Sequence, residues 1–288
     1  MYRCLKDYQV FATDLGVLYR GDCLGIMQFL DDNSIDCVFA DPPFNLDKNY
    51  KNGRSDNLDD DDYINWSMKW LNECIRVLRP GGALLVYNIP RWCVYYSRYL
   101  IDRLQFVNWI CVDVKNGMPI KNRYSPAHYG LLYFVKDGGE RIFNKQRIPI
   151  QTCRHCGGEI KDYGGHRDRL NKSGLGLSDV WTDIYPVRKK KHRKNNELSI
   201  KLMERILSCH TNPEDVILDP FGGTGTTYVV AELLNRHWIG IEIGDCEVIK
   251  NRFEDICDDK NEIKKIKECN GLFTNRAIEL RKRNGFWL

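Results

Sequence analysis

Asp219-Pro-Phe-Gly-Gly-Thr-Gly-Thr-Thr227 is the stretch of this chain that says most about its architecture. An apolar run, 215–219, precedes it and predicts a buried strand, and a helical pattern follows at 228–234. Open α/β sheets bind nucleotide-like ligands at such a turn, because small residues allow a close approach and the helix N-terminus offers amide donors. Glu242 lies 17 residues beyond Gly225, at the end of the next predicted strand. It matches the acidic residue that holds ribose hydroxyls in such folds.

A dinucleotide site fits this loop poorly. Its third glycine would stand at position 228, where the chain has Tyr228, and no Gly-Lys-Ser/Thr follows to make a P-loop. A ligand with a ribose and a carboxylate but no phosphate, such as S-adenosylmethionine, suits the loop better. The alternative is a glycine-rich turn that binds nothing.

The rest of the chain alternates apolar runs with amphipathic stretches, which predicts an α/β fold. Strands are expected at 34–40, 83–87, 106–114, 129–135, 215–219 and 238–243, and helices at 63–78, 198–209 and around 228–234. The last forty or so residues are charged and are expected to be helical. No internal repeat is present.

Asp41-Pro-Pro-Phe44 ends the first of these strands in a stiff, extended loop, because each proline fixes its own φ and restricts its predecessor. An amine conjugated into a base ring is a weak nucleophile unless acceptors hold its N–H groups. The Asp41 carboxylate and the Pro42 carbonyl could supply these acceptors, and Phe44 could stack on a base swung out of the duplex. The alternative is a purely structural Pro-Pro turn.

The tetrapeptide and the glycine loop together resemble the amino-methyltransferases of DNA, and their order along the chain resembles the circularly permuted β class of that family. Tyr19-Arg-Gly-Asp-Cys23, Leu78-Arg-Pro-Gly-Gly82 and the segment 119–135 also resemble family motifs. The resemblance extends from about Gly16 to Arg252. It implies a Rossmann-like S-adenosylmethionine methyltransferase fold, with a mixed, mostly parallel sheet flanked by helices, and a single catalytic domain over residues 1–288.

The resemblance also implies roles for individual residues. Asp22 and Cys23 would lie near the adenine of S-adenosylmethionine and Glu242 on its ribose. The loop residues that would complete the cofactor site are Asp219, Phe221, Gly223, Thr224, Gly225, Thr226 and Thr227. The catalytic residues would be Asp41, Pro42, Pro43 and Phe44. The chain departs from the family at His192–Ser199, which lacks the usual His-Pro-Thr-x-Lys-Pro-like pattern, so the contact to the methionine carboxylate has no assigned residue.

Residues 137–196 carry no sustained periodicity and are expected to form a target-recognition insertion within the catalytic domain. Arg188-Lys-Lys-Lys-His-Arg-Lys194 holds six formal positive charges in seven residues. In this setting phosphate contact is favoured over a merely solvated loop. The expected DNA-binding residues are His166, Arg167, Arg169, Lys172, Arg188, Lys189, Lys190, Lys191, Arg193 and Lys194.

Cys153-Arg-His-Cys156 has the spacing of one half of a zinc knuckle. A tetrahedral site needs four ligands, and no second Cys-x-x-Cys follows. We therefore predict no metal, with zinc at Cys153 and Cys156 as the alternative.

Length, composition and charge limit where the protein could reside and what it could bind. The chain has 288 residues, twelve cysteines and a formal net charge of +4, from 43 basic and 39 acidic side chains. It has no run of about 18–20 apolar residues that could cross a membrane and no secretory signal, so a cytoplasmic protein with reduced thiols is expected. The small net charge is compatible with DNA binding because acidic stretches at 56–62 and 255–259 offset the basic insertion.

The predicted function is therefore site-specific methylation of an exocyclic amine in double-stranded DNA, with S-adenosylmethionine as cofactor. Adenine N6 is favoured over cytosine N4 because Asp stands at position 41, and a restriction–modification system with a cognate endonuclease and a homodimer are expected. Competing hypotheses are RNA methylation and, from another class, a zinc-knuckle nucleic-acid-binding protein with a vestigial methyltransferase fold.

Overall fold

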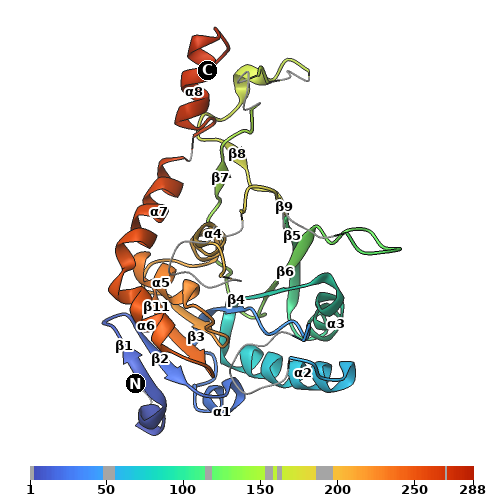
Figure 1. Ribbon diagram of the computed structural model, residues 1–288, viewed down its shortest axis with the longest axis vertical. Helices are drawn as coiled ribbons and strands as arrows, with labels where there is room; N and C mark the ends of the chain where they lie inside the picture. The colour runs from blue at the N-terminus through green and yellow to red at the C-terminus, as the bar shows by residue number, and fades with distance from the viewer. Residues whose placement is uncertain are drawn as a thin grey trace. The chain divides into compact units, whose positions relative to one another are not determined.

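The computed structural model describes residues 3–47, 56–113, 119–152, 158–160, 164–185, 197–269 and 271–288. The chain divides into two compact units. Unit 1 comprises Met1–Asn144 and Asp179–Cys257, and unit 2 comprises Lys145–Ser178 and Asp258–Leu288 (Figure 1). Both motifs that suggested a methyltransferase lie in unit 1.

Unit 1 is built on a sheet in which nine strands of the described residues pair in the order β1-β2-β11-β10-β3-β4-β6-β5-β9. The strands are β1 (Gln9–Ala12), β2 (Gly16–Arg20), β3 (Ile35–Ala40), β4 (Leu78–Asn88), β5 (Gln105–Asp113), β6 (His128–Val135), β9 (Val180–Trp181), β10 (Val216–Asp219) and β11 (His237–Glu242). From β2 to β4 all neighbours are parallel, whereas β1 and β6 run antiparallel to their neighbours. The predicted mixed, mostly parallel sheet is confirmed.

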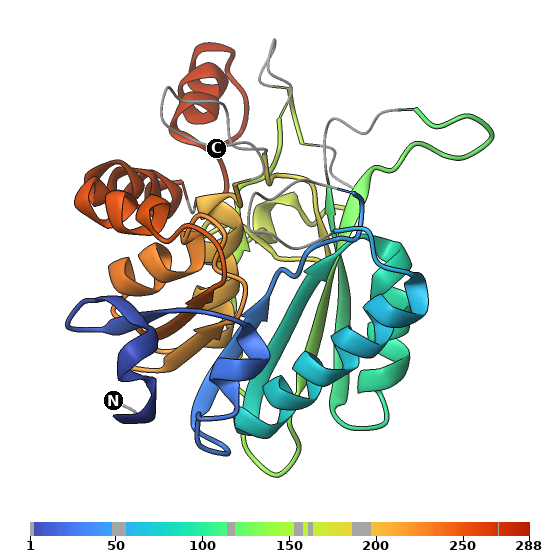
Figure 2. The ribbon, with the colours of Figure 1, turned by 60° about the horizontal axis from the view of Figure 1, so that its bottom comes forward.

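Helices cover both faces of this sheet. On one side lie α1 (Cys23–Met27), α2 (Asp60–Val77) and α3 (Pro90–Leu100), of which α2 and α3 run along β4 and β6 (Figure 2). On the other side lie α4 (Ile200–His210) and α5 (Thr226–Leu233). Successive residues of β6 face opposite sides of the sheet. Phe134 joins the cluster beneath α2 and α3, while the ring of its neighbour Tyr133 packs at a tilt against that of His210 of α4, with centroids 4.3 Å apart.

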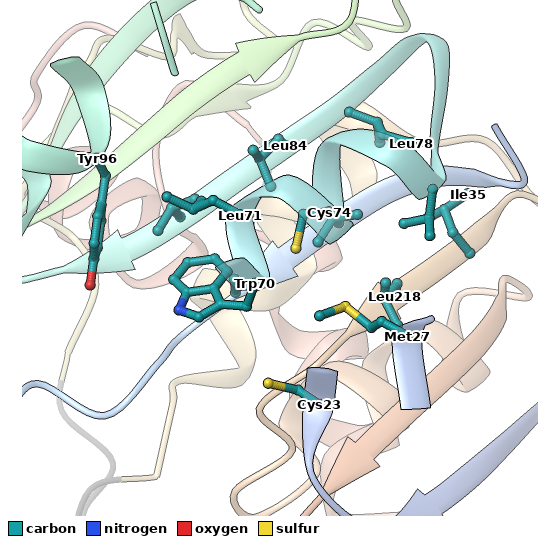
Figure 3. Packing of buried hydrophobic residues seen from close by; sticks show 14 of the residues in the cluster. Cys23, Met27, Ile35, Trp70, Leu71, Cys74, Leu78, Leu84, Tyr96 and Leu218 are labelled. Atoms are coloured by element: carbon teal, nitrogen blue, oxygen red, sulfur yellow. The ribbon is translucent and has the colours of Figure 1, made fainter. Parts of the chain in front are cut away.

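The main core lies between the sheet and the first helical layer. In α2 the buried residues Trp70, Leu71 and Cys74 recur at the spacing of one helical face. They meet Leu84 of β4 and Leu218 of β10, together with Cys23 and Met27 of α1 (Figure 3). This packing fixes α1 and α2 beside the strands that carry both motifs.

Unit 2 has its own small core. β7 (Arg147–Ile148) pairs antiparallel with β8 (Leu175–Gly176), a 3-10 turn, η2, spans Arg167–Arg169, and most of α7 (Ile256–Glu268) and all of α8 (Asn275–Arg283) belong to this unit. Leu272, Phe273 and Ala277 form the buried cluster. The partly buried residues packed on it are Ile150, Ile160, Leu170, Leu175, Ile278 and Trp287.

Arg281 of α8 stabilises unit 2 from inside. Its side chain is completely buried, and it donates to the carbonyl of Trp287 at 2.6 Å and to that of Gly158 at 2.8 Å. It also contacts Glu159 at 3.3 Å. The segments 158–160 and 281–287 are thereby joined although they lie far apart in the sequence.

Most predicted elements are confirmed, with ends that differ by a few residues. The largest difference is β4, which was expected to begin at residue 83 and begins at Leu78, so that Pro80 and Gly81 belong to the strand. Gly81 takes a φ of 78° there, and its amide donates to the carbonyl of Lys136. The C-terminal residues are helical as expected, in α6 (Glu247–Glu254), α7 and α8.

Unit 2 draws on two separate parts of the chain. Residues 145–178 of the predicted insertion form a unit with residues 258–288, which the sequence patterns did not connect to them. Within the described part of the chain, no helix combines the length and the apolar character needed to cross a membrane.

Candidate active site and cofactor site

The predicted site residues of unit 1 come together at one edge of the sheet. β2, β11, β10 and β3 are consecutive and mutually parallel, so their carboxyl ends share this edge. Asp22 follows β2, Glu242 ends β11, the glycine loop follows β10 and Asp41 follows β3. Ligands of open α/β sheets bind at this edge.

The glycine loop is open on the side where a ligand could approach. Gly223 has a φ of 53°, and a Cβ built on it would meet only the Phe221 carbonyl oxygen, at 4.0 Å. Gly225 has a φ of 76° and caps α5, and a Cβ there would lie 2.9 Å from Ile249. Both positions therefore require glycine, Gly223 for its backbone angle and Gly225 for its angle and for space.

Asp219 stabilises the conformation of this loop by hydrogen bonds. Its carboxylate is buried and accepts hydrogen bonds from the Phe221 amide at 2.9 Å and from the Thr227 hydroxyl. Burial raises the pKa of Asp219 to about 7, against the opposing effect of these two hydrogen bonds. Asp219 and Thr227 thus contact the loop itself, and a direct contact of either with a cofactor stays a prediction.

Glu242 ties the loop to the neighbouring strand. One carboxylate oxygen accepts the Gly223 amide at 2.7 Å and the other accepts the Gly244 amide at 2.6 Å. Burial raises the pKa of Glu242, although both amides act in the opposite direction. Since each carboxylate oxygen can accept a second hydrogen bond, the pair of oxygens is suited to a ribose diol.

Tyr228 fills the place where a dinucleotide fold would have a third glycine. Its hydroxyl donates to the Asp219 carbonyl at 3.0 Å and accepts the Ile241 amide at 3.2 Å. A Cβ on Gly240 would lie 2.6 Å from the ring. The tyrosine ring therefore sets the distance between α5 and the strands beneath it.

The other cofactor residues lie close to the core. The Phe221 ring packs edge-on against Trp70 at 5.2 Å and against Trp66 at 5.9 Å. Asp22 caps α1 by accepting the amides of Leu24 at 3.0 Å and Gly25 at 3.3 Å, and Cys23 is buried. These contacts fix the edge of the site, and the expectation that Asp22 and Cys23 lie near an adenine stays a prediction.

The Asp41-Pro-Pro-Phe44 loop is held from three sides. The Tyr63 hydroxyl of α2 donates to the Pro43 carbonyl, and the Trp92 indole of α3 donates to the Phe44 carbonyl at 2.7 Å. Asp56 accepts the amides of the next two residues, 45 and 46, at 2.9 and 3.1 Å. The loop is thus positioned before any substrate arrives.

Two tyrosines lie near enough to Asp41 for its charge to act on them. The rings of Phe44 and Tyr129 lie 5.5 Å apart, and those of Tyr87 and Tyr129 lie 5.1 Å apart. Burial, and secondarily the charge of Asp41, raise the pKa of both Tyr87 and Tyr129. Sequence reasoning missed both tyrosines, although Tyr87 near the end of β4 and Tyr129 near the start of β6 were placed on predicted strands.

In unit 2 the predicted DNA contacts differ in accessibility. His166, Arg169 and Lys172 are exposed. Arg167 instead contacts Glu159 at 3.3 Å and lies over the Trp287 ring at 5.6 Å. The basic run at 188–194 and the pair Cys153 and Cys156 lie outside the described residues. Within the described residues no cluster of three His, Cys, Asp or Glu side chains is placed to hold a metal ion.

Comparison with known proteins agrees with this geometry. The family model N6_N4_Mtase, described as DNA methylase, matches residues 35–251. The chain is 56% identical over 287 residues to the type II methyltransferase M.BamHI of Bacillus amyloliquefaciens. The aligned region covers 99% of this chain and 67% of that protein. It is 32% identical to the type II methyltransferase M.HpaI of Haemophilus parainfluenzae, over 82% of this chain and 74% of that protein.

Among solved structures, the crystal structure of the M1.HpyAVI–SAM complex matches with a TM-score of 0.52 and 26% identity, over 83% of this chain and 98% of that one. The family match spans both motifs and the strands that carry them. The chain therefore belongs to the DNA methylase family of N6 and N4 methyltransferases and is a DNA methyltransferase.

Proposed function

We propose that this enzyme transfers a methyl group from S-adenosylmethionine to the exocyclic amine of a base flipped out of double-stranded DNA, and that the base is adenine, methylated at N6. The observation that supports this most is the adjacency of β3 and β10. Those two parallel strands end in the catalytic tetrapeptide and in the glycine loop, which would hold the two reactants.

The residues at this edge fit the cofactor in their chemistry. Glu242 offers carboxylate oxygens for a ribose diol, and the exposed backbone at Gly223 leaves room beside the loop for an amino acid group. When bound, S-adenosylmethionine supplies an electrophilic methyl group on a sulfonium.

Asp41 and Pro42 prepare the amine for attack. The Asp41 carboxylate and the Pro42 carbonyl accept hydrogen bonds from the two N–H groups, which returns the nitrogen lone pair from the ring to the nitrogen. A fixed loop reduces the reorganisation needed during the reaction. A flipped base could stack on Phe44, which follows Asp41 in the tetrapeptide, or on Tyr129, whose ring lies 5.5 Å from that of Phe44.

Methyl transfer to unmethylated DNA, compared between wild type and Asp41→Ala, tests this assignment. We expect the rate to fall by about 100-fold or more, as when one preorganised electrostatic group is removed from an active site. Binding of S-adenosylmethionine should persist. An Asp41→Ala protein that methylates DNA at the wild-type rate would contradict the role of Asp41, and a preference for RNA over DNA would contradict the substrate.

The base is tested separately, by expression in a methylation-free host and modification-sensitive sequencing of its DNA. We expect N6-methyladenine at one recognition sequence. N4-methylcytosine would overturn the choice of adenine and leave the amine chemistry intact.

The remaining parts of the proposal concern the setting of the enzyme. Exposed His166, Arg169 and Lys172 of unit 2 are proposed to contact DNA, together with the basic run at 188–194. The names of the relatives M.BamHI and M.HpaI, both type II methyltransferases, support a restriction–modification role with a cognate endonuclease. A cytoplasmic location and a homodimer are part of the same proposal.

A further inference from the structure

Arg252 of α6 reaches the glycine loop from the side. Its Nη1 donates to the Thr226 hydroxyl at 2.8 Å, to the Thr224 carbonyl at 3.2 Å and to the Thr224 hydroxyl at 3.3 Å. Thr224 belongs to the loop, and Thr226 is the first residue of α5. A single guanidinium therefore fixes the last part of the loop.

The charge of Arg252 is balanced by Glu197, which lies just before α4. Their Nη1 and Oε1 atoms are 2.9 Å apart, and the two side chains are only 10% and 3% exposed. The Thr226 hydroxyl also donates to the carbonyl of Leu198 at 3.4 Å. The ion pair thus joins α6, the glycine loop and the segment that leads into α4.

Stability alone is a weak explanation for this pair. Removing two charges from water is costly, and apolar residues of similar volume often support a fold equally well or better. The segment that it fixes has an unusual backbone, because Thr224 stands between Gly223 and Gly225, both with positive φ. Glycines in such a stretch widen the range of conformations available to a free loop.

We propose that Arg252 and Glu197 are positioning residues for S-adenosylmethionine, which hold the glycine loop in the conformation that receives the amino acid end of the cofactor. The inference rests on the proposed function, since it assumes that this loop binds S-adenosylmethionine. Glu197 and Leu198 stand in the segment where the lysine-containing family pattern is missing. A loop that is already ordered loses less conformational entropy on binding, so the cofactor binds more tightly.

The test replaces the pair by neutral side chains of similar size, Glu197→Gln with Arg252→Met, in the full-length protein. Calorimetry without DNA measures the Kd for S-adenosylmethionine, and hydrogen exchange reports on the amides of residues 221–226. We expect the Kd to rise about 10- to 100-fold, the range seen when supporting contacts around a site are removed. Loop exchange should become faster, and Arg252→Lys alone should restore part of the affinity.

Steady-state kinetics separate positioning from general damage. The KM for S-adenosylmethionine should rise, while kcat at saturating cofactor and the Kd for DNA stay near wild type. The matched control is Arg236→Met, which removes another buried arginine, one that donates to the carbonyls of Leu234 and Thr211 at the opposite end of β11. It should lower the melting temperature without a selective loss of cofactor affinity.

Two results would overturn the inference. One is an unchanged Kd for S-adenosylmethionine in the double variant. The other is a joint loss of cofactor affinity, DNA affinity and melting temperature of the kind produced by Arg236→Met. A wild-type protein that does not bind S-adenosylmethionine at all would instead contradict the proposed function, whatever the variants do.

Discussion

Two side chains, one from α2 and one from α3, hold the Asp41–Phe44 tetrapeptide in place. Tyr63 and Trp92 donate to the carbonyls of Pro43 and Phe44. For Tyr63→Phe we expect a loss of about 1 kcal/mol in stability, the usual contribution of one hydrogen bond. We also expect kcat to fall by about 10- to 100-fold, because small displacements of positioned groups are costly in catalysis. Denaturant unfolding and single-turnover methylation measure the two effects.

Tyr99→Phe is the matched control for this substitution. It removes a comparable phenolic hydrogen bond, from Tyr99 of α3 to the side chain of Asn72 at 2.6 Å, away from the tetrapeptide. The control should keep the wild-type kcat. If both variants lose activity equally, the hydrogen bond from Tyr63 has no special part in positioning the loop.

Asp219 gives the protein a pH-dependent stability. Its pKa rises from an ordinary 3.8 to about 7 on folding, mainly through burial. The folded protein therefore keeps a proton that the unfolded chain has released, and this group lowers the free energy of unfolding as the pH rises from 3.8 to about 7. The slope is at most about 1.4 kcal/mol per pH unit.

Asp219→Asn should lack this contribution. Denaturant titration at several pH values measures the unfolding free energy of wild type and of Asp219→Asn. Between pH 3.8 and about 7 the unfolding free energy of wild type should fall relative to that of the variant, and above about 7 the difference should stay constant. Parallel curves across that range would show that the carboxyl group titrates normally. Glu242, whose pKa is also raised by burial, is present in both proteins, so its contribution to the unfolding free energy largely cancels in the difference.

The packing of α5 against its strands depends on one ring and one glycine. A Cβ on Gly240 would lie 2.6 Å from the Tyr228 ring. Gly240→Ala should therefore destabilise the protein by about 1–3 kcal/mol, as expected for overpacking a core, and should weaken cofactor binding by moving α5. Gly176→Ala is the control, because a Cβ there meets nothing within 4 Å. Equal melting temperatures for the two variants would contradict the account of Tyr228.

The elements that carry the site were predictable because each strand ends at a distinctive residue. Apolar runs stop at Asp41, Asp219 and Glu242, and parallel strands bring such ends to one edge. The supports of the site were not predictable. Tyr63 and Trp92 lie 20 and 48 residues from the carbonyls that they bind, and aromatic side chains at helical spacing indicate only a buried face.

The buried contact of Arg252 with Glu197 was likewise not predictable from the sequence. A single arginine on a polar helix is normally exposed, so its sequence context gives no sign that its charge is buried against Glu197. Periodicity is a local signal, and it does not reveal which distant segment a side chain reaches. The joining of residues 145–178 to residues 258–288 was missed for the same reason.

At the scale of the whole molecule, unit 2 depends on the C-terminal residues for its core. Phe273 is 5% exposed and packs with residues from 150 to 175. Phe273→Ala should cost about 3–5 kcal/mol within unit 2. Hydrogen exchange should then become faster in residues 145–152 and 164–178 but stay unchanged in β3, β4 and β10, and S-adenosylmethionine should still bind. Faster exchange throughout unit 1 would contradict the independence of the two cores.

The order of strands in the sheet also has a consequence for biosynthesis. β2 and β3 are consecutive in the sequence, yet β11 and β10 from the last third of the chain lie between them. A ribosome-bound chain that ends before residue 216 therefore lacks two interior strands of its sheet and has unpaired edges on β2 and β3, which favours association with other chains. The glycine loop after β10 and the Asp41–Phe44 tetrapeptide after β3 become neighbours only when β10 pairs with β3. We expect the shorter nascent chains to be inactive and folding to be slow for a domain of this size, since the contacts between β3 and β10 span so much sequence.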